Sequence, residues 1–163
     1  MTYLERAHYG YYVVARAWVR MLSPGSAILD VGARDSPVAT WGEYANRYTV
    51  DRDVLKARPG VNTYRADWMQ WKVPETMHVT TCLQVIEHLT DEQLRPFVDK
   101  LFAHTKHLII SVPYEWEKGV EPDHHQDPIS LEKFMDQMMP VRPLEYAISV
   151  GGKRMRLVAR WEL

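Results

Sequence analysis

A short apolar run that ends in an acid and a glycine constrains the fold of this chain most strongly. Residues 27–36 read Ala-Ile-Leu-Asp-Val-Gly-Ala-Arg-Asp-Ser. The apolar residues are typical of a buried parallel strand, and Asp30 can accept hydrogen bonds where that strand ends. Gly32 lets the backbone come close to a ligand because it has no Cβ. The stretch therefore predicts a strand that leads into a nucleotide-like binding loop.

Segments of strand character alternate with helical segments along the rest of the chain. Strands are expected over residues 26–31, 47–50, 61–65, 78–83, 107–112, 143–150 and 154–161. Helices are expected over residues 4–22, in a short form over 36–46 and 54–58, after the cap Thr90, and over 131–138. The pattern predicts an α/β, Rossmann-like, doubly wound sheet that is mostly parallel and seven-stranded, with a C-terminal antiparallel hairpin and helices on both faces.

Length and charge narrow the class of protein. The 163 residues predict one domain, in which residues 1–22 form an N-terminal helix and residues 23–163 the core. A net charge of -1 offers no basic field for nucleic acid or an acidic membrane surface. Cys82 is the only cysteine, which fits a reducing compartment, and no signal peptide or membrane span is recognisable. We expect a cytoplasmic protein.

Further acids and polar residues follow the next predicted strands in order. Asp51 ends the second strand, Asp67 follows the third, and residues 84–89 after the fourth read Gln-Val-Ile-Glu-His-Leu. Because the carboxyl ends of parallel strands meet at one edge of a sheet, these side chains are expected to line one site.

In these motifs the chain resembles the class I S-adenosylmethionine-dependent methyltransferases, in particular the small-molecule branch with a Leu-Glu-His signature after the fourth strand. The resemblance runs from about Ser23 to the C-terminus. It implies cofactor contacts at Asp30, Gly32, Ala33, Arg34, Asp51, Arg52, Asp67, Trp68, Gln84 and Val85. In the resemblance Asp51 would receive the ribose hydroxyls and Asp67 the adenine amino group, with Trp68 beside the adenine ring.

The first motif departs from the family pattern, because Arg34 and Ser36 stand where further glycines are usual. Arg34 could pair with the carboxylate of the cofactor or block its pocket. The resemblance implies methyl transfer from S-adenosylmethionine to a small-molecule acceptor by a monomer or homodimer. The departures keep open a non-catalytic binding or partner subunit. A nucleotide-dependent oxidoreductase of related fold is disfavoured, because Gly-x-Gly-x-x-Gly is absent.

Candidate catalytic residues are His88, His124 and Tyr114, chosen because each can exchange a proton with an acceptor. Glu87 and His125 are further candidates for a base. Residues 123–127 read Asp-His-His-Gln-Asp, but neighbouring residues rarely converge on one ion, so no metal site is predicted. This loop after the fifth strand is instead expected to contact the acceptor.

Overall fold

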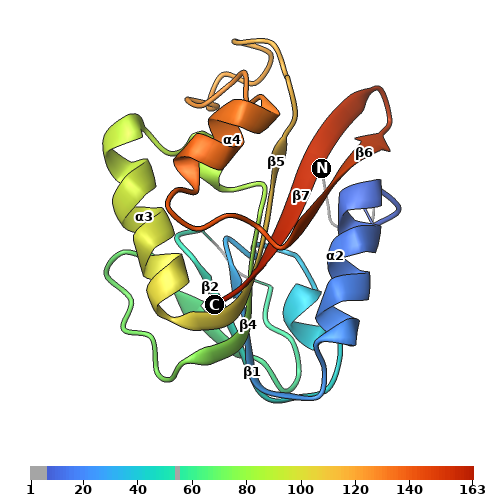
Figure 1. Ribbon diagram of the computed structural model, residues 1–163. Helices are drawn as coiled ribbons and strands as arrows, with labels where there is room; N and C mark the ends of the chain where they lie inside the picture. The colour runs from blue at the N-terminus through green and yellow to red at the C-terminus, as the bar shows by residue number, and fades with distance from the viewer. Residues whose placement is uncertain (1–6, 54–55) are drawn as a thin grey trace.

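A seven-stranded sheet forms the centre of the molecule, and the computed structural model describes residues 7–53 and 56–163. The strands are β1 (Gly25–Val31), β2 (Tyr44–Asp51), β3 (Asn62–Arg65), β4 (Met77–Leu83), β5 (Thr105–Pro113), β6 (Glu145–Gly151) and β7 (Arg154–Glu162). Their order is β3-β2-β1-β4-β5-β7-β6, and only the pairings of β7 are antiparallel. The predicted mostly parallel sheet with a C-terminal hairpin is confirmed (Figure 1).

Helices cover both faces of the sheet, as predicted. The elements are α2 (Gly10–Met21), α3 (Asp91–Ala103), α4 (Leu131–Gln137) and the short 3₁₀ turns η1 (Val38–Thr40) and η2 (Ile86–His88). Helices α3 and α4 lie on one face, and α2 lies on the other against β6 and β7 (Figure 1). Within the described ranges, no helix combines the length and apolar character needed to cross a bilayer.

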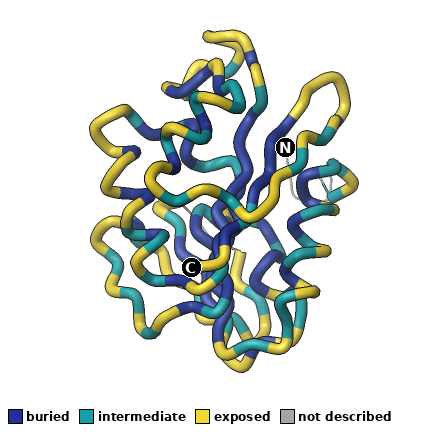
Figure 2. The backbone as a smooth tube through the Cα atoms, viewed as in Figure 1, coloured by how far each residue is buried: buried dark blue, intermediate teal, exposed yellow. Residues whose placement is uncertain are grey.

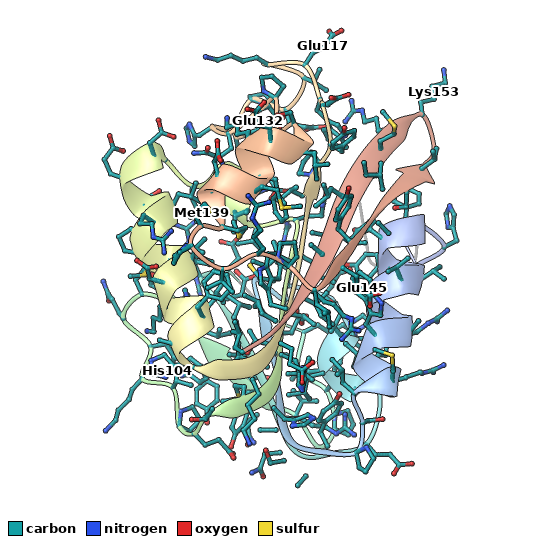
Figure 3. The ribbon with its side chains drawn as sticks, viewed as in Figure 1. His104, Glu117, Glu132, Met139, Glu145 and Lys153 are labelled. Carbon is teal, nitrogen blue, oxygen red and sulfur yellow. The ribbon has the colours of Figure 1, made fainter. Side chains whose placement is uncertain are left out.

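The alternation of side chains along β1 divides the core in two. Leu29 and Val31 pack with α3 and α4, whereas Ile28 packs with α2 and η1. All three are at most 2% exposed, because the sheet is covered on both faces. The buried residues accordingly run through the sheet, while the loop tips are exposed (Figure 2). At those tips Glu117 and Lys153 point away from the body of the protein (Figure 3).

The predicted helix over residues 36–46 is wrong. Only the 3₁₀ turn η1 forms there, and β2 already begins at Tyr44. The guanidinium of Arg47 donates hydrogen bonds to the carbonyl oxygens of Ala39 and Gly42, at 2.7 and 2.8 Å. A side chain from β2 thus satisfies backbone groups of the short connection, which therefore needs no full helix.

Two other helical segments differ in extent. The N-terminal helix begins at Gly10, and the part of its prediction before residue 7 lies outside the described residues. Residues 54–55 of the predicted 54–58 helix also lie outside them, and residues 56–58 show no regular structure. Helix α3 begins as predicted, because Thr90 and Gln93 form a reciprocal capping box.

Gly32 allows the loop after β1 to pack closely against the loop after β4. Its φ of +76° lies in the left-handed region, and a Cβ there would lie 2.3 Å from Cγ2 of Val85. Its N–H donates to the carbonyl oxygen of Val50 at 2.9 Å. A side chain at residue 32 would therefore push the loops after β1 and β4 apart.

We expect Gly32→Ala to lower the free energy of unfolding more than Gly60→Ala. Gly60 has a similar φ of +72°, but nothing lies within 4 Å of its would-be Cβ. Gly60→Ala then isolates the cost of the left-handed backbone, about 1–2 kcal/mol, and Gly32→Ala adds an overpacking cost of about 1–3 kcal/mol. Urea unfolding measures both. Equal losses would show that the contact with Val85 relaxes freely.

Candidate functional site

The carboxyl ends of the parallel strands form one edge of the sheet, and the predicted cofactor residues lie there. Val31 pairs with Val50 and Asp51 pairs with Arg65, so that β1, β2 and β3 end side by side. The loops that follow these strands are therefore neighbours. The structure brings the predicted acids to this edge as the sequence indicates.

Asp30 lies beneath this edge and is 2% exposed. Its Oδ1 accepts a hydrogen bond from Oγ1 of Thr81 at 2.7 Å, and Oδ2 has no hydrogen-bond partner. Burial raises the pKa of the carboxyl group from its ordinary value of 3.8 to about 7, despite the hydrogen bond from Thr81. Asp30 therefore titrates near neutral pH.

Asp51 joins the loops after β1 and β2. Its Oδ2 accepts from the backbone N–H of Arg34 at 3.0 Å, and its Oδ1 accepts from the N–H of Asp53 at 2.9 Å. Each carboxylate oxygen has a second lone pair, and the side chain is partly exposed. The group can therefore still accept hydrogen bonds from two hydroxyls of a ligand.

The other residues of these loops differ in exposure. Arg34 adopts a φ of +41°, and its side chain is exposed rather than packed into the core. Ala33 is buried, with 3% exposure, and Arg52 is exposed. Because Arg34 is an exposed residue, its side chain does not fill a buried pocket at Asp51.

Asp67 and Trp68, which follow β3, differ in burial. Oδ1 of Asp67 accepts from the N–H of Met69 at 2.8 Å, and Asp67 is partly exposed. Trp68 is 4% exposed, and its indole packs in the core with Phe97 while Nζ of Lys100 lies 4.7 Å from its ring centroid. Asp67 is therefore partly accessible after β3, whereas the Trp68 indole is buried in the core.

Gln84 connects β4 to β7, a link that the sequence did not reveal. Its φ is +59°, and its Oε1 accepts from Nε of Arg156 at 3.0 Å. Arg156 is 8% exposed, and its guanidinium lies 4.9 to 5.2 Å from the ring centroids of Tyr9, Tyr11 and Trp116. Contacts of this kind between a cation and aromatic faces stabilise a buried guanidinium.

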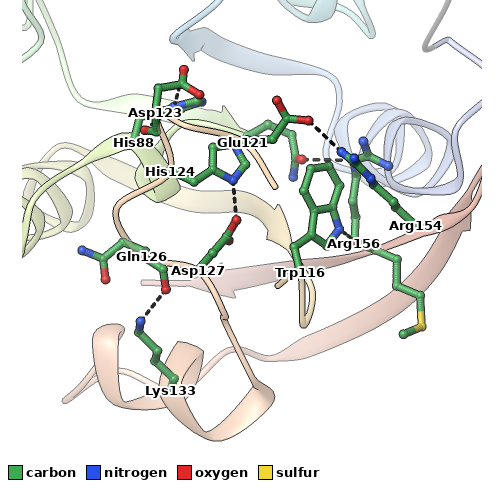
Figure 4. Close-up of polar contacts among 12 residues, drawn as sticks. His88, Trp116, Glu121, Asp123, His124, Gln126, Asp127, Lys133, Arg154 and Arg156 are labelled. Atoms are coloured by element: carbon green, nitrogen blue, oxygen red, sulfur yellow. Dashed lines mark hydrogen bonds and ion pairs between the residues drawn. The ribbon is translucent and has the colours of Figure 1, made fainter. Parts of the chain in front are cut away.

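A second group of polar residues surrounds η2 (Figure 4). Nδ1 of His88 lies 3.1 Å from both the carbonyl oxygen and Oδ2 of Asp123. Nδ1 of His124 lies 2.7 Å from Oδ2 of Asp127. The two imidazole rings meet edge to face with centroids 4.7 Å apart. Two predicted catalytic histidines therefore lie together, although they come from different loops.

Glu87 is the buried member of this group and lies close to both histidines. It is 1% exposed, its Oε2 has no hydrogen-bond partner, and burial raises the pKa of its carboxyl group to about 8. Its backbone carbonyl oxygen accepts from the N–H groups of His125 and Gln126, at 2.8 and 3.2 Å. These two bonds fix the loop that carries His124 onto η2.

Gln126 anchors the same loop to the helices. Its Nε2 donates to the carbonyl oxygen of Leu89 and to Oδ1 of Asp91, each at 2.9 Å, and its Oε1 accepts from Gln137 at 2.7 Å. Its backbone carbonyl oxygen accepts from Nζ of Lys133 (Figure 4). The Gln126 side chain is buried, with 1% exposure, and both its amide nitrogen and its amide oxygen are hydrogen-bonded. It therefore holds the loop in one position.

Tyr114 lies apart from the two histidines. It is partly exposed at the end of β5, and the groups that raise its pKa, besides desolvation, are Glu115 and Tyr146 of β6. Trp116 takes the place near the histidines instead, with its ring stacked on His124 at a centroid distance of 5.7 Å. Both Trp116 and Asp127 lie in segments expected to contact the acceptor, but the sequence did not predict that they contact His124.

The comparisons with known proteins bear on the fold. No protein-family model matches the chain, and no curated protein matches its sequence. The solved N-methyltransferase NodS from Bradyrhizobium japonicum in complex with S-adenosyl-L-homocysteine is 14% identical, with a TM-score of 0.70 over 95% of this chain and 88% of that chain.

Two further solved structures agree with it. The 1,6-didemethyltoxoflavin-N1-methyltransferase of Burkholderia thailandensis is 13% identical, with a TM-score of 0.71 over 96% of this chain and 80% of that chain. An S-adenosylmethionine-dependent methyltransferase from Clostridium acetobutylicum is 10% identical, with a TM-score of 0.68 over 100% of this chain and 92% of that chain. The chain therefore has the fold of the class I S-adenosylmethionine-dependent methyltransferases.

We expect Asp30→Asn to change how stability depends on pH. The folded state holds the Asp30 proton up to about pH 7, whereas the unfolded chain releases it near pH 4. The stability of the wild type should therefore fall, relative to Asp30→Asn, as pH rises from 4 to 7, by on the order of 4 kcal/mol when fully deprotonated. Urea unfolding at several pH values measures this difference.

The exposed Asp53 provides a matched control, because Asp53→Asn makes the same substitution where the side chain is not buried. Its pH profile should follow that of the wild type. Parallel profiles for the wild type and Asp30→Asn would contradict the burial of an uncompensated carboxyl group.

Proposed function

We propose that this protein transfers a methyl group from S-adenosylmethionine to a small-molecule acceptor. The observation that carries the proposal is the Asp51 carboxylate, which lies between the loops after β1 and β2 and keeps lone pairs for two hydroxyls. Gly32 lies in the first of these loops, and Asp67 lies at the end of the neighbouring strand. The NodS structure has the same fold with the demethylated product bound.

The described residues fit such a cofactor. Asp51 would hold the ribose and Asp67 the adenine amino group, and the tight turn at Gly32 with the buried Ala33 lets the backbone approach the methionine part. Gln84 and Val85 would lie beneath the methyl donor, because they follow β4 and Val85 lies against this loop. The exposed side chain of Arg34 can reach a carboxylate there.

When bound, S-adenosylmethionine supplies a methyl carbon activated by a sulfonium leaving group. The main task of the chain is then to hold the acceptor in line with that carbon. Arg156, which lies among aromatic rings, holds Gln84 by a hydrogen bond. Gln126 holds the loop that carries His124. These contacts fix the residues expected to surround the acceptor. His88 or His124 would take the proton of an acceptor that must lose one.

The arrangement favours an enzyme over a non-catalytic subunit of the same fold. That alternative rested on the shortened helices and on Arg34 as a side chain that closes the pocket. Arg34 is exposed, and its backbone N–H supports Asp51 instead of displacing it. The fold and the pair of histidines at the acceptor side both fit catalysis.

Titration calorimetry with S-adenosylhomocysteine tests the proposal, with NAD as the control ligand. We expect micromolar binding of the sulfur nucleotide by the wild type and none of NAD. Asp51→Asn should weaken the binding by about 10- to 100-fold, because hydrogen bonds to a charged acceptor are worth about 1.5–3 kcal/mol.

Asp53→Asn is the matched variant, since it removes a carboxylate two positions away that has no assigned ligand contact. It should bind like the wild type. A folded wild-type protein that fails to bind S-adenosylhomocysteine at millimolar concentration would refute the proposed function.

A further inference from the structure

One cluster of side chains has the residue types and the spacing of a metal site: Glu87, His88 and His124. One ligand atom from each residue lies within 4.8 Å of the other two. Two ligands of one ion, each at about 2.1 Å from it, lie about 3–4 Å apart, so small side-chain rotations close the remaining difference. The cluster draws on η2 and on the loop after β5, which the contacts of the Glu87 carbonyl oxygen hold together.

Both histidines are oriented as ligands usually are. Nδ1 of His124 is bonded to the buried carboxylate of Asp127, and Nδ1 of His88 to oxygens of Asp123. Each Nδ1 contact leaves Nε2 of the same ring available to a ligand. A carboxylate or carbonyl behind the imidazole is the usual support of a metal-bound histidine, because it fixes the tautomer and the ring plane.

The Glu87 side chain is a second, independent observation. Its Oε2 is buried with no hydrogen-bond partner, in a residue that is 1% exposed. A buried carboxylate without a partner is costly unless a proton or a cation neutralises it, and a bound cation would displace that proton. The nearby Arg156 interacts electrostatically with the Glu87 carboxyl group, but its Nε donates a hydrogen bond to Gln84 and its guanidinium lies over aromatic rings.

We propose that Glu87, His88 and His124 bind one divalent ion of the first transition row, with Zn²⁺ as its representative. Two imidazoles and a carboxylate favour such ions over Mg²⁺, which prefers oxygen ligands throughout. The sequence predicted no metal here because residues 123–127 are adjacent to one another. The proposed ligand set takes only His124 from that segment, and Asp127 serves as its support.

An ion with three protein ligands keeps positions open for water or for an oxygen or nitrogen of another molecule. The stack of His124 on Trp116, and of Trp116 on Arg156, places the cluster beside the acceptor side of the site. A role toward the acceptor rests on the proposed function, and with the ion bound His88 and His124 are its ligands and no longer free to take the acceptor's proton. The binding of the ion itself does not, since none of its three ligands is a predicted adenosine contact.

The test uses the full chain, stripped with a chelator and titrated with Zn²⁺ alone in a calorimeter. Visible absorption with Co²⁺ then reports the coordination. We expect one equivalent of tight binding, weakened at least tenfold in His88→Gln and in His124→Gln. His125→Gln is the matched control, because His125 is an exposed neighbour of His124 and lies outside the cluster; it should bind like the wild type.

His88→Gln keeps the test decisive if His124→Gln does not fold, because the His88 side chain is 35% exposed whereas that of His124 is 7% exposed. Circular dichroism verifies the fold of each variant. No binding by the folded wild type, or equal losses in His88→Gln and His125→Gln, would overturn the proposal.

Titration of the same samples with S-adenosylhomocysteine separates the two proposals. Zinc binding without nucleotide binding would leave the ion site standing and remove the proposed function. Nucleotide binding without zinc binding would leave the proposed function standing and remove the ion site.

Discussion

The contact between Gly32 and Val85 brings the loops after β1 and β4 against each other, and the arrangement of the site depends on it. The two strands are neighbours in the sheet, but strand pairing alone does not fix where their loops go. The left-handed backbone of Gly32 turns its loop onto Val85 at a distance that no other residue permits. From there the backbone N–H of Arg34 reaches Asp51, and the next residues of the β4 loop enter η2.

This edge of the sheet divides into two chemically different halves. On one side Asp51 and Asp67 offer carboxylates with backbone donors already in place, which suits the hydroxyl and amino groups of a nucleoside. On the other side His88 and His124 lie over the buried Glu87. Gln84 stands between them and is held by Arg156. One half is suited to bind a cofactor, and the other is suited to proton or metal chemistry.

Local patterns predicted most of the fold. The apolar runs of β1 and β5, the capping residue Thr90 and the turn at Gly152 each mark an element in its own residues. The helix expected over residues 36–46 was wrong because Arg47, a residue of the next strand, bonds the carbonyl groups of that connection. A partner from another element leaves no signal in the local pattern.

The sequence by itself determined that Asp30 and Asp51 lie at the ends of strands and that Asp67 follows one, and parallel strands place such residues at one edge of a sheet. It also identified His88 and His124, but as separate candidates. Only the tertiary structure decided that they meet over Glu87, that Asp127 supports one of them, and that Tyr114 lies elsewhere. The physical reason is that two backbone hydrogen bonds to the Glu87 carbonyl oxygen and the buried bonds of Gln126 set the path of a long loop. Contacts between residues far apart in the sequence, such as Glu87 and His125, leave no periodic pattern from which they could be predicted.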